Sequence, residues 1–123
     1  HVYNLDDQDM EEVHKIVADY MGRAEENDVK EEYVVNSVKA SVLARKLMEH
    51  FQCNAFTAPC PDACATRRMN EEQFTFCFTH TLLNEMGIPS ACEYDLIGVL
   101  SIATLAALTG KAPYQGNTQP CVY

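Results

Sequence analysis

Apolar residues in the N-terminal half of the chain recur three and four positions apart, which is the spacing of one helix face. This pattern predicts a first helix that begins after a cap at Asp7 and ends near Gly22, since glycine suits a helix C-terminus. A second amphipathic helix is predicted from Asp28 and Glu31, which have the spacing of a capping box, to about Gln52. The first half of the chain is therefore expected to be helical.

The C-terminal half contains short apolar runs that are typical of buried strands. We expect strands over residues 53–59 and 88–92, because both runs are bounded by turn-forming or polar residues. A loop over residues 60–69 and a helix over residues 70–87 separate them. The second strand leads into a long apolar helix over residues 96–109, which a glycine closes.

Strands that alternate with helices are typical of an α/β fold with a parallel sheet. We expect a three-layer architecture, a parallel sheet flanked by helices, with residues 1–123 in a single domain. The helix over residues 96–109 is apolar nearly all round, which predicts burial on more than one side. Because a chain of 123 residues supplies few partners for such a helix, we expect a fragment of a larger multidomain protein, or a subunit of a homo-oligomer.

Charge and composition narrow the classes of function. The net charge is −9, which argues against a nucleic-acid partner, because phosphate contacts need clustered Lys and Arg. The same charge disfavours an anionic membrane surface, and no apolar segment reaches the roughly 20 residues that cross a bilayer. Several of the 6 cysteines lie in apolar runs. We therefore expect reduced thiols in a cytoplasmic protein, with a disulfide framework as the alternative.

Two carboxylates, Glu93 and Asp95, stand where the second strand ends and the last helix begins. Ligands of parallel sheets bind beyond the carboxyl ends of the strands, so these acids lie where such folds keep their sites. Two carboxylates there suit a hard divalent ion such as Mg²⁺ or Mn²⁺, and a carboxylate can also act as a general acid or base. In the alternative interpretation Asp95 only caps its helix and Glu93 is a solvated loop residue.

Thiols offer a different kind of site. Cys60 and Cys64 have three residues between them, but a zinc or iron–sulfur site needs further ligands at fitting positions. The remaining candidates, Cys53, Cys77 and His80, are spread over a predicted strand and a predicted helix. A thiol-bound metal therefore stays one hypothesis beside that of thiols without a function.

Two further pairs are weaker candidates. Cys77 and His80 are three residues apart, so they share a helix face and suggest a nucleophile with its base. Arg67 and Arg68 lie in the loop after the first predicted strand, where they could bind an anionic group or only be solvated.

Residues 82–117 show a resemblance to a known family. The segment LLNEMGIPSACEYDLIGVLSIATLAALTGKAPYQGN resembles the middle domain of the L-fucose isomerase and L-arabinose isomerase group. That domain carries a helix ending in Leu-x-x-x-Gly-Ile-Pro, a strand closing in Cys/Ala-Glu-x-Asp, and a long apolar helix ending in Thr-Gly. The resemblance is good over about the last third of the chain and thins to a general α/β pattern upstream.

The resemblance implies a metal-dependent aldose–ketose isomerase that acts on a monosaccharide. Mn²⁺ or another divalent metal would help to hold the open-chain sugar and stabilise an enediolate, while a carboxylate would move the proton. Glu93 and Asp95 match the positions that the family uses as metal-binding and catalytic carboxylates. The family completes this site with an acid and a His from a following domain, so the isolated chain is expected to be inactive.

One departure from the family weakens the isomerase hypothesis. The fucose isomerase branch has a second acid on the preceding helix, at or beside the position of Cys77, where this chain has no carboxylate. Glu71 and Glu72 lie more than one helical turn too early. The alternative is a non-catalytic binding or assembly module, in which the apolar helix over residues 96–109 is a subunit contact and the acids are only caps.

Overall fold

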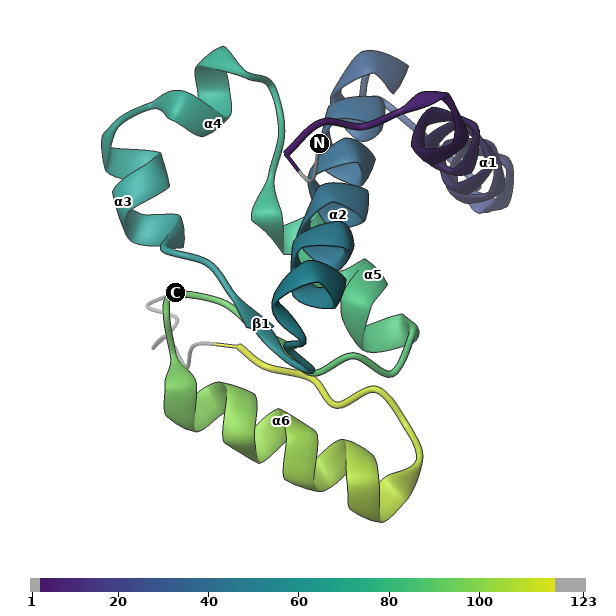
Figure 1. Cartoon of the computed structure of the whole chain (residues 1–123). Coiled ribbons are helices and arrows are strands. Elements are labelled where there is room, and N and C mark those ends of the chain that lie inside the picture. The colour runs from purple at the N-terminus through teal and green to yellow at the C-terminus, as the bar shows by residue number, and fades with distance from the viewer. Residues whose placement is uncertain (1–2, 117–123) are drawn as a thin grey trace, which may run out of the picture.

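The computed structural model describes residues 3–116, apart from the side chain of Cys64. The described part of the chain is mostly helical, as Figure 1 shows. It contains two strands of two residues each, which lie between helices. The elements in chain order are α1 Asp7–Arg23, α2 Glu31–Phe51, β1 Phe56–Thr57, α3 Cys60–Ala65, α4 Arg68–Glu71, α5 Phe76–Glu85, β2 Ser90–Ala91 and α6 Leu96–Thr109.

The main apolar core lies between α1, α2 and α5. Val13 and Val17 of α1 meet Val38 and Val42 of α2 and Leu82 of α5, and all of these side chains are at most 3% exposed. Burial of such a side chain contributes about 1.5–3 kcal/mol relative to leaving it in water. The sequence predicts the two helices of the first half of the chain from the spacing of their apolar residues. These apolar faces are the ones that hold the two helices together.

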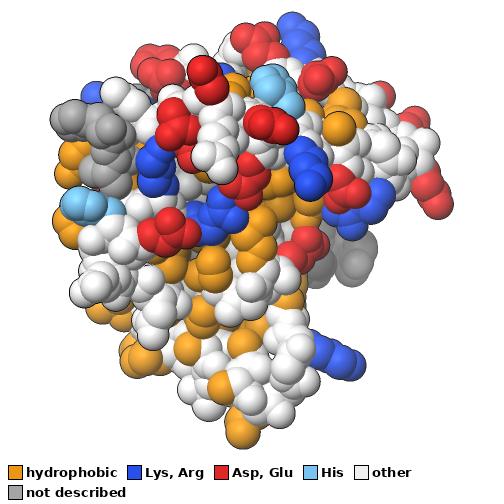
Figure 2. Space-filling view, turned by 45° about the vertical axis from the view of Figure 1, so that its right-hand side comes forward, with side chains coloured by type: hydrophobic (Ala, Val, Ile, Leu, Met, Phe, Trp, Pro, Cys, Tyr) orange, Lys and Arg blue, Asp and Glu red, His pale blue; other side chains and the backbone are white. Residues whose placement is uncertain are grey.

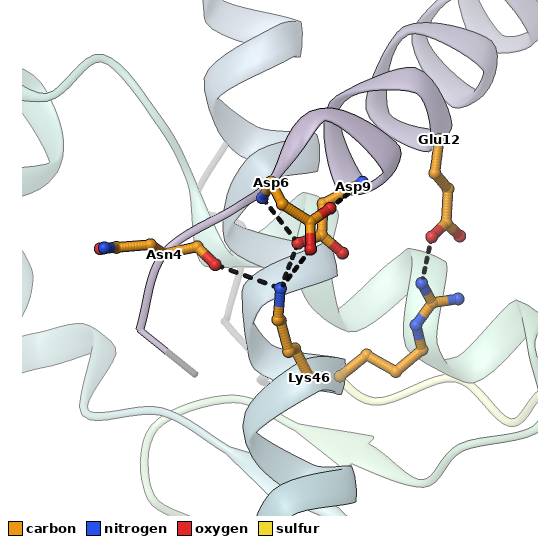
Figure 3. Close-up of polar contacts among 6 residues, drawn as sticks. Asn4, Asp6, Asp9, Glu12 and Lys46 are labelled. Atoms are coloured by element: carbon orange, nitrogen blue, oxygen red, sulfur yellow. Dashed lines mark hydrogen bonds and ion pairs between the residues drawn. The ribbon is translucent and has the colours of Figure 1, made fainter. Parts of the chain in front are cut away.

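Charged side chains join α1 to α2 at one edge of this core (Figure 3). Asp6 caps α1 through a reciprocal capping box with Asp9, in which both hydrogen bonds measure 2.9 Å. The Lys46 ammonium group of α2 donates to the Asp9 carboxylate and to the backbone oxygen of Asn4. This contact lowers the pKa of the Asp9 carboxyl, because the Lys46 hydrogen bond and the backbone N–H of Asp6 both favour the charged form.

β1 and β2 form a parallel pair in which Phe56 lies opposite Ser90 and Thr57 lies opposite Ala91. α5 packs on one side of this pair and α6 on the other (Figure 1). The second apolar cluster, formed by Ala91 with Val99 and Ile102 of α6, lies on the α6 side. The strand pair therefore brings the ends of two distant segments together, although it is too short to carry a layer of the fold.

The predicted three-layer α/β fold is wrong. The described residues contain one sheet of two strands, each two residues long, and most helices pack on one another instead of on the sheet. The run over residues 53–59 was expected to be one buried strand, but only Phe56–Thr57 of it forms β1. The chain leaves α2 at Gln52 in a left-handed conformation (φ 56°), and Cys53 is exposed. Apolar runs of this length do not show how many strands pair, since pairing depends on distant partners.

Several predicted element boundaries also differ. Residues 60–69 were expected to be a loop and instead form α3 and the start of α4. A helix over residues 70–87 was expected to be capped by Asn70, but Gln73 takes a left-handed conformation (φ 55°) and α5 begins after Thr75, whose hydroxyl accepts from the Cys77 N–H. The cap of α1 is Asp6 and not the predicted Asp7. α2 begins after Lys30, without the capping box that was predicted for Asp28 and Glu31.

α6 begins and ends where the sequence predicts. Asp95 caps its N-terminus by accepting from the Gly98 N–H at 2.8 Å, and Gly110 closes it in a left-handed conformation (φ 66°). The expected burial on more than one side is not found, because Val99 and Ile102 are buried while Ile97 and other large apolar residues of this helix are exposed. Figure 2 shows most of the charged side chains of that view on the upper part of the molecule and hydrophobic ones exposed at the lower end, where α6 lies. Among the described residues, no helix has the length and apolar character needed to cross a membrane.

Candidate functional site

A cavity of about 540 Å³ opens at the carboxyl end of β2. α5 contributes Cys77 and His80 to its lining, the residues after β2 contribute Cys92 and Glu93, and the segment after α6 contributes Gln115. Ligands of parallel strands bind beyond their carboxyl ends. The sequence placed the candidate site at this edge, and the structure has a cavity there.

A larger open hollow of about 760 Å³ runs along α1 and α5. Two of its polar residues bond to each other, since the Tyr20 hydroxyl donates to the Glu85 carboxylate, and the Arg23 guanidinium lies 4.4 Å from the centre of the Tyr20 ring. Burial, followed by the neighbouring Glu85, raises the pKa of Tyr20. These contacts join α1 to α5, and we assign the hollow a packing role.

The turn that carries Glu93 is strained. The Asp95 N–H donates to the Cys92 carbonyl at 3.2 Å, which closes a turn whose two central residues, Glu93 and Tyr94, have φ of 64° and 60°. Turns with positive φ at both central positions favour Asn and Gly, and other residues there cost about 1–2 kcal/mol each. The Tyr94 N–H also donates to the Ala58 carbonyl at 3.1 Å, so the turn is tied to the segment after β1.

The two predicted site carboxylates take different positions. Glu93 is exposed and lines the cavity, whereas Asp95 caps α6 and also accepts from the Gln115 side-chain amide at 3.4 Å. Gln115 reaches back to the turn, because its side-chain oxygen accepts from the Cys92 N–H at 3.0 Å. Gly98 allows this packing, since a Cβ there would lie 2.6 Å from an Asp95 carboxylate oxygen. Asp95 therefore has the capping role of the alternative interpretation, and its role in metal binding stays a prediction.

Cys60, His80 and Cys92 form a cluster at the same edge. Cys60 is the first residue of α3 and follows β1, Cys92 follows β2, and His80 lies on α5 against the strands. The Sγ atoms and one ring nitrogen lie within 4.8 Å of one another, and Cys60 Sγ is 3.7 Å from His80 Nε2. Cys60 and His80 are buried at 8% and 7% exposure, while Cys92 is half-buried.

The orientation of His80 is fixed from its other ring nitrogen. Nδ1 lies 2.7 Å from the Ser90 hydroxyl oxygen. The backbone of Ser90 is held in turn by the Asn84 side chain, which accepts a hydrogen bond from the Ser90 N–H and donates one to the Ser90 carbonyl. Burial lowers the pKa of His80, which favours the neutral imidazole. Burial also raises the pKa of the Cys92 thiol to about 12, with a further contribution from the Cys60 thiol.

The remaining candidates are placed as follows. Cys77 is exposed on α5 and lines the cavity, but the ring nitrogens of His80 contact Cys60 and Ser90 instead. Arg67 and Arg68 are exposed at the start of α4 and do not line this cavity. The Cys64 side chain lies outside the described part of the structure.

The sequence did not identify Cys92 and Ser90 as site residues. A usable signal was present, because Cys60 follows one predicted parallel strand and Cys92 is the last residue of the other, and two such strand ends meet at one edge. Comparisons with protein families, with curated proteins and with solved structures found no match to this chain.

Proposed function

We propose that this chain is a domain of an aldose–ketose isomerase-like protein and supplies Glu93 to a metal-dependent site that a further domain completes. The observation that carries the proposal is the placement of Glu93 on a strained turn at the carboxyl end of β2, where it lines a cavity of about 540 Å³. Strained backbone is often kept where a side chain has a functional task. The resemblance of residues 82–117 to the fucose and arabinose isomerase group supplies the class of reaction.

The role of Glu93 in this proposal follows from carboxylate chemistry. Conversion of an aldose to a ketose moves a proton between neighbouring carbon atoms, and a carboxylate at the cavity can accept and return it. Mn²⁺, when bound, would stabilise the enediolate as a Lewis acid. An ion of this kind prefers six oxygen ligands, and Glu93 with Asp95 supplies only a part of them. The substrate, water and the further domain would supply the rest, so we expect the chain alone to bind Mn²⁺ weakly and to be inactive.

The test is a Mn²⁺ titration followed by the electron paramagnetic resonance signal of the free ion. We expect weak binding, on the order of millimolar, that Glu93→Gln abolishes, because the change removes the charge and keeps the shape of the side chain. Glu85→Gln is the matched control, since Glu85 lines the same cavity but bonds to Tyr20. No loss in Glu93→Gln, or an equal loss in the control, would contradict the proposal.

A second candidate function, assembly into a homo-oligomer, is favoured by the surface of α6. Ile97, Leu100 and Leu108 of this helix are between 68% and 78% exposed, and contiguous apolar surface of this kind marks interaction sites. Sedimentation of the chain would then show a concentration-dependent dimer that Leu100→Glu disrupts. Gln8→Glu, which adds the same charge to an exposed position of α1, should leave the dimer intact. A monomer at all concentrations would contradict this candidate.

A further inference from the structure

The geometry points to a zinc site formed by Cys60, His80 and Cys92, with its fourth coordination position open to the cavity at the end of β2. This site is distinct in chemistry from the oxygen site proposed for Glu93, and it does not depend on that proposal. Each ligand comes from a different part of the chain, so the fold itself brings the three together.

The spacing of the ligand atoms fits a tetrahedral metal. Zn–S and Zn–N bonds of about 2.3 and 2.05 Å at the tetrahedral angle place the two ligand atoms about 3.6 Å apart. Cys60 Sγ and His80 Nε2 are 3.7 Å apart, and all three ligand atoms lie within 4.8 Å of one another. Only small side-chain movements are needed to bring each atom into bonding distance of a single ion.

The hydrogen bond from His80 to Ser90 has the form that metal-binding histidines use. With the proton on Nδ1, that N–H donates to the Ser90 hydroxyl at 2.7 Å, and the lone pair of Nε2 faces the Cys60 sulfur. Such outer contacts fix the tautomer and the ring direction of a metal ligand. Ser90 is 1% exposed, and the Asn84 side chain forms hydrogen bonds to both its backbone N–H and its carbonyl, so this support is rigid.

The ligand set selects zinc among common metals. Two thiolates and one imidazole are soft or intermediate ligands, which suit Zn²⁺, whereas Mn²⁺ and Mg²⁺ prefer oxygen. An iron–sulfur cluster needs four protein ligands, and the cluster in the described residues offers three. On binding, each of the two thiols loses its proton as its sulfur bonds to the ion, so two protons are released for each Zn²⁺.

The fourth position has access to solvent through the cavity. His80 and Cys92 both line it, while Cys60, which is also buried, does not. Three protein ligands with an open position are the arrangement of catalytic zinc, in which a water molecule or a substrate oxygen is the fourth ligand. The exposed residues Cys77 and Glu93 line the same cavity, so a molecule on the zinc would lie beside them.

The test uses the full chain, stripped of metal under reducing conditions and titrated with Zn²⁺ against a chromogenic chelator. We expect one Zn²⁺ per chain, and at least about 100-fold weaker binding in Cys60→Ser, Cys92→Ser and His80→Gln, since loss of an outer contact alone costs 10–100-fold. Ser90→Ala, which keeps all three ligands, should fall in that 10–100-fold range. Cys53→Ser removes an exposed thiol outside the cluster and should bind as the wild type does.

A Co²⁺ spectrum keeps the test decisive if a variant folds poorly. Wild-type protein should show an intense thiolate-to-cobalt absorption, which Cys92→Ser, at a half-buried position, should reduce by about half while circular dichroism stays unchanged. The proposal is overturned if the reduced chain takes up less than about a tenth of an equivalent of Zn²⁺, or if the three ligand variants bind as tightly as Cys53→Ser. None of these variants changes Glu93, so failure of the isomerase proposal leaves this result unaffected.

Discussion

Replacement of Tyr94 by glycine should leave the protein more stable than replacement by alanine does, although both changes remove the same large side chain. Tyr94 has a φ of 60° at the second central position of the turn after β2, and its side chain is 62% exposed. The left-handed conformation costs a non-glycine residue about 1–2 kcal/mol, because its Cβ crowds the following carbonyl oxygen. Glycine avoids this cost, while little buried surface is lost with the ring.

The expected magnitude follows from two opposing terms. Relief of the strain gains about 1–2 kcal/mol, and the greater freedom of glycine in the unfolded chain returns about 0.5–1 kcal/mol. The net gain relative to Tyr94→Ala, which also lacks the ring but keeps the Cβ, is about 1 kcal/mol. For 123 residues, an unfolding entropy of about 2.1 cal/mol/K per residue converts this gain to a Tm increase of about 4 °C.

Thermal and urea unfolding of wild type, Tyr94→Gly and Tyr94→Ala measure the difference. Tyr94→Gly should unfold at a higher temperature than Tyr94→Ala, with equal urea m-values. Tyr114 is the matched control position, because it is exposed but has no positive φ. There the glycine variant should be no more stable than the alanine variant. If Tyr94→Gly is less stable than Tyr94→Ala, the turn is not strained and the case for a site held under strain fails.

Two further predictions concern charged groups outside the cluster. Lys46 lowers the pKa of Asp9 below its ordinary value near 3.8. This contact therefore stabilises the fold above that value, and the stabilisation is lost as the pH falls through the lowered pKa. The difference in Tm between wild type and Asp9→Asn should be present at pH 6 and should shrink as the pH falls below about 4. Asp95 caps α6, so Asp95→Ala should lower the free energy of unfolding by about 0.5–2 kcal/mol. Asp95→Asn, which can still cap the helix, should change this free energy little. If the two variants lose the same free energy in urea unfolding, the capping role is contradicted.

The features that could be predicted from the sequence are local ones. Asp95 and Gly110 mark the ends of α6 because capping depends on one or two neighbouring residues. Asn70 failed as a cap, because Gln73 turns the chain into a left-handed conformation that the spacing of apolar residues does not reveal. The sheet failed for a different reason, since the extent of strand pairing depends on contacts between distant segments.

The candidate site was predictable in position but not in full composition. Strand ends and helix caps place Glu93 and Asp95 at the edge where the cavity lies, although only Glu93 lines it. Cys60, His80 and Cys92 come from separate parts of the chain, and Cys60 and His80 are 20 positions apart in sequence. These three residues come together because α5 packs against β2, and no motif of short sequence spacing predicts this proximity.

The most direct test of the proposed function is the location of Mn²⁺ on the chain. Amide signals near a bound Mn²⁺ broaden in nitrogen–proton correlation spectra, and a net charge of −9 provides other acidic positions, such as Asp6 and Asp9, where the ion could bind instead. We expect the amides of residues 92–95 to broaden first in wild type and to stay sharp in Glu93→Gln. Broadening confined to the start of α1, or unchanged by Glu93→Gln, would contradict the assignment of Glu93 to the metal site.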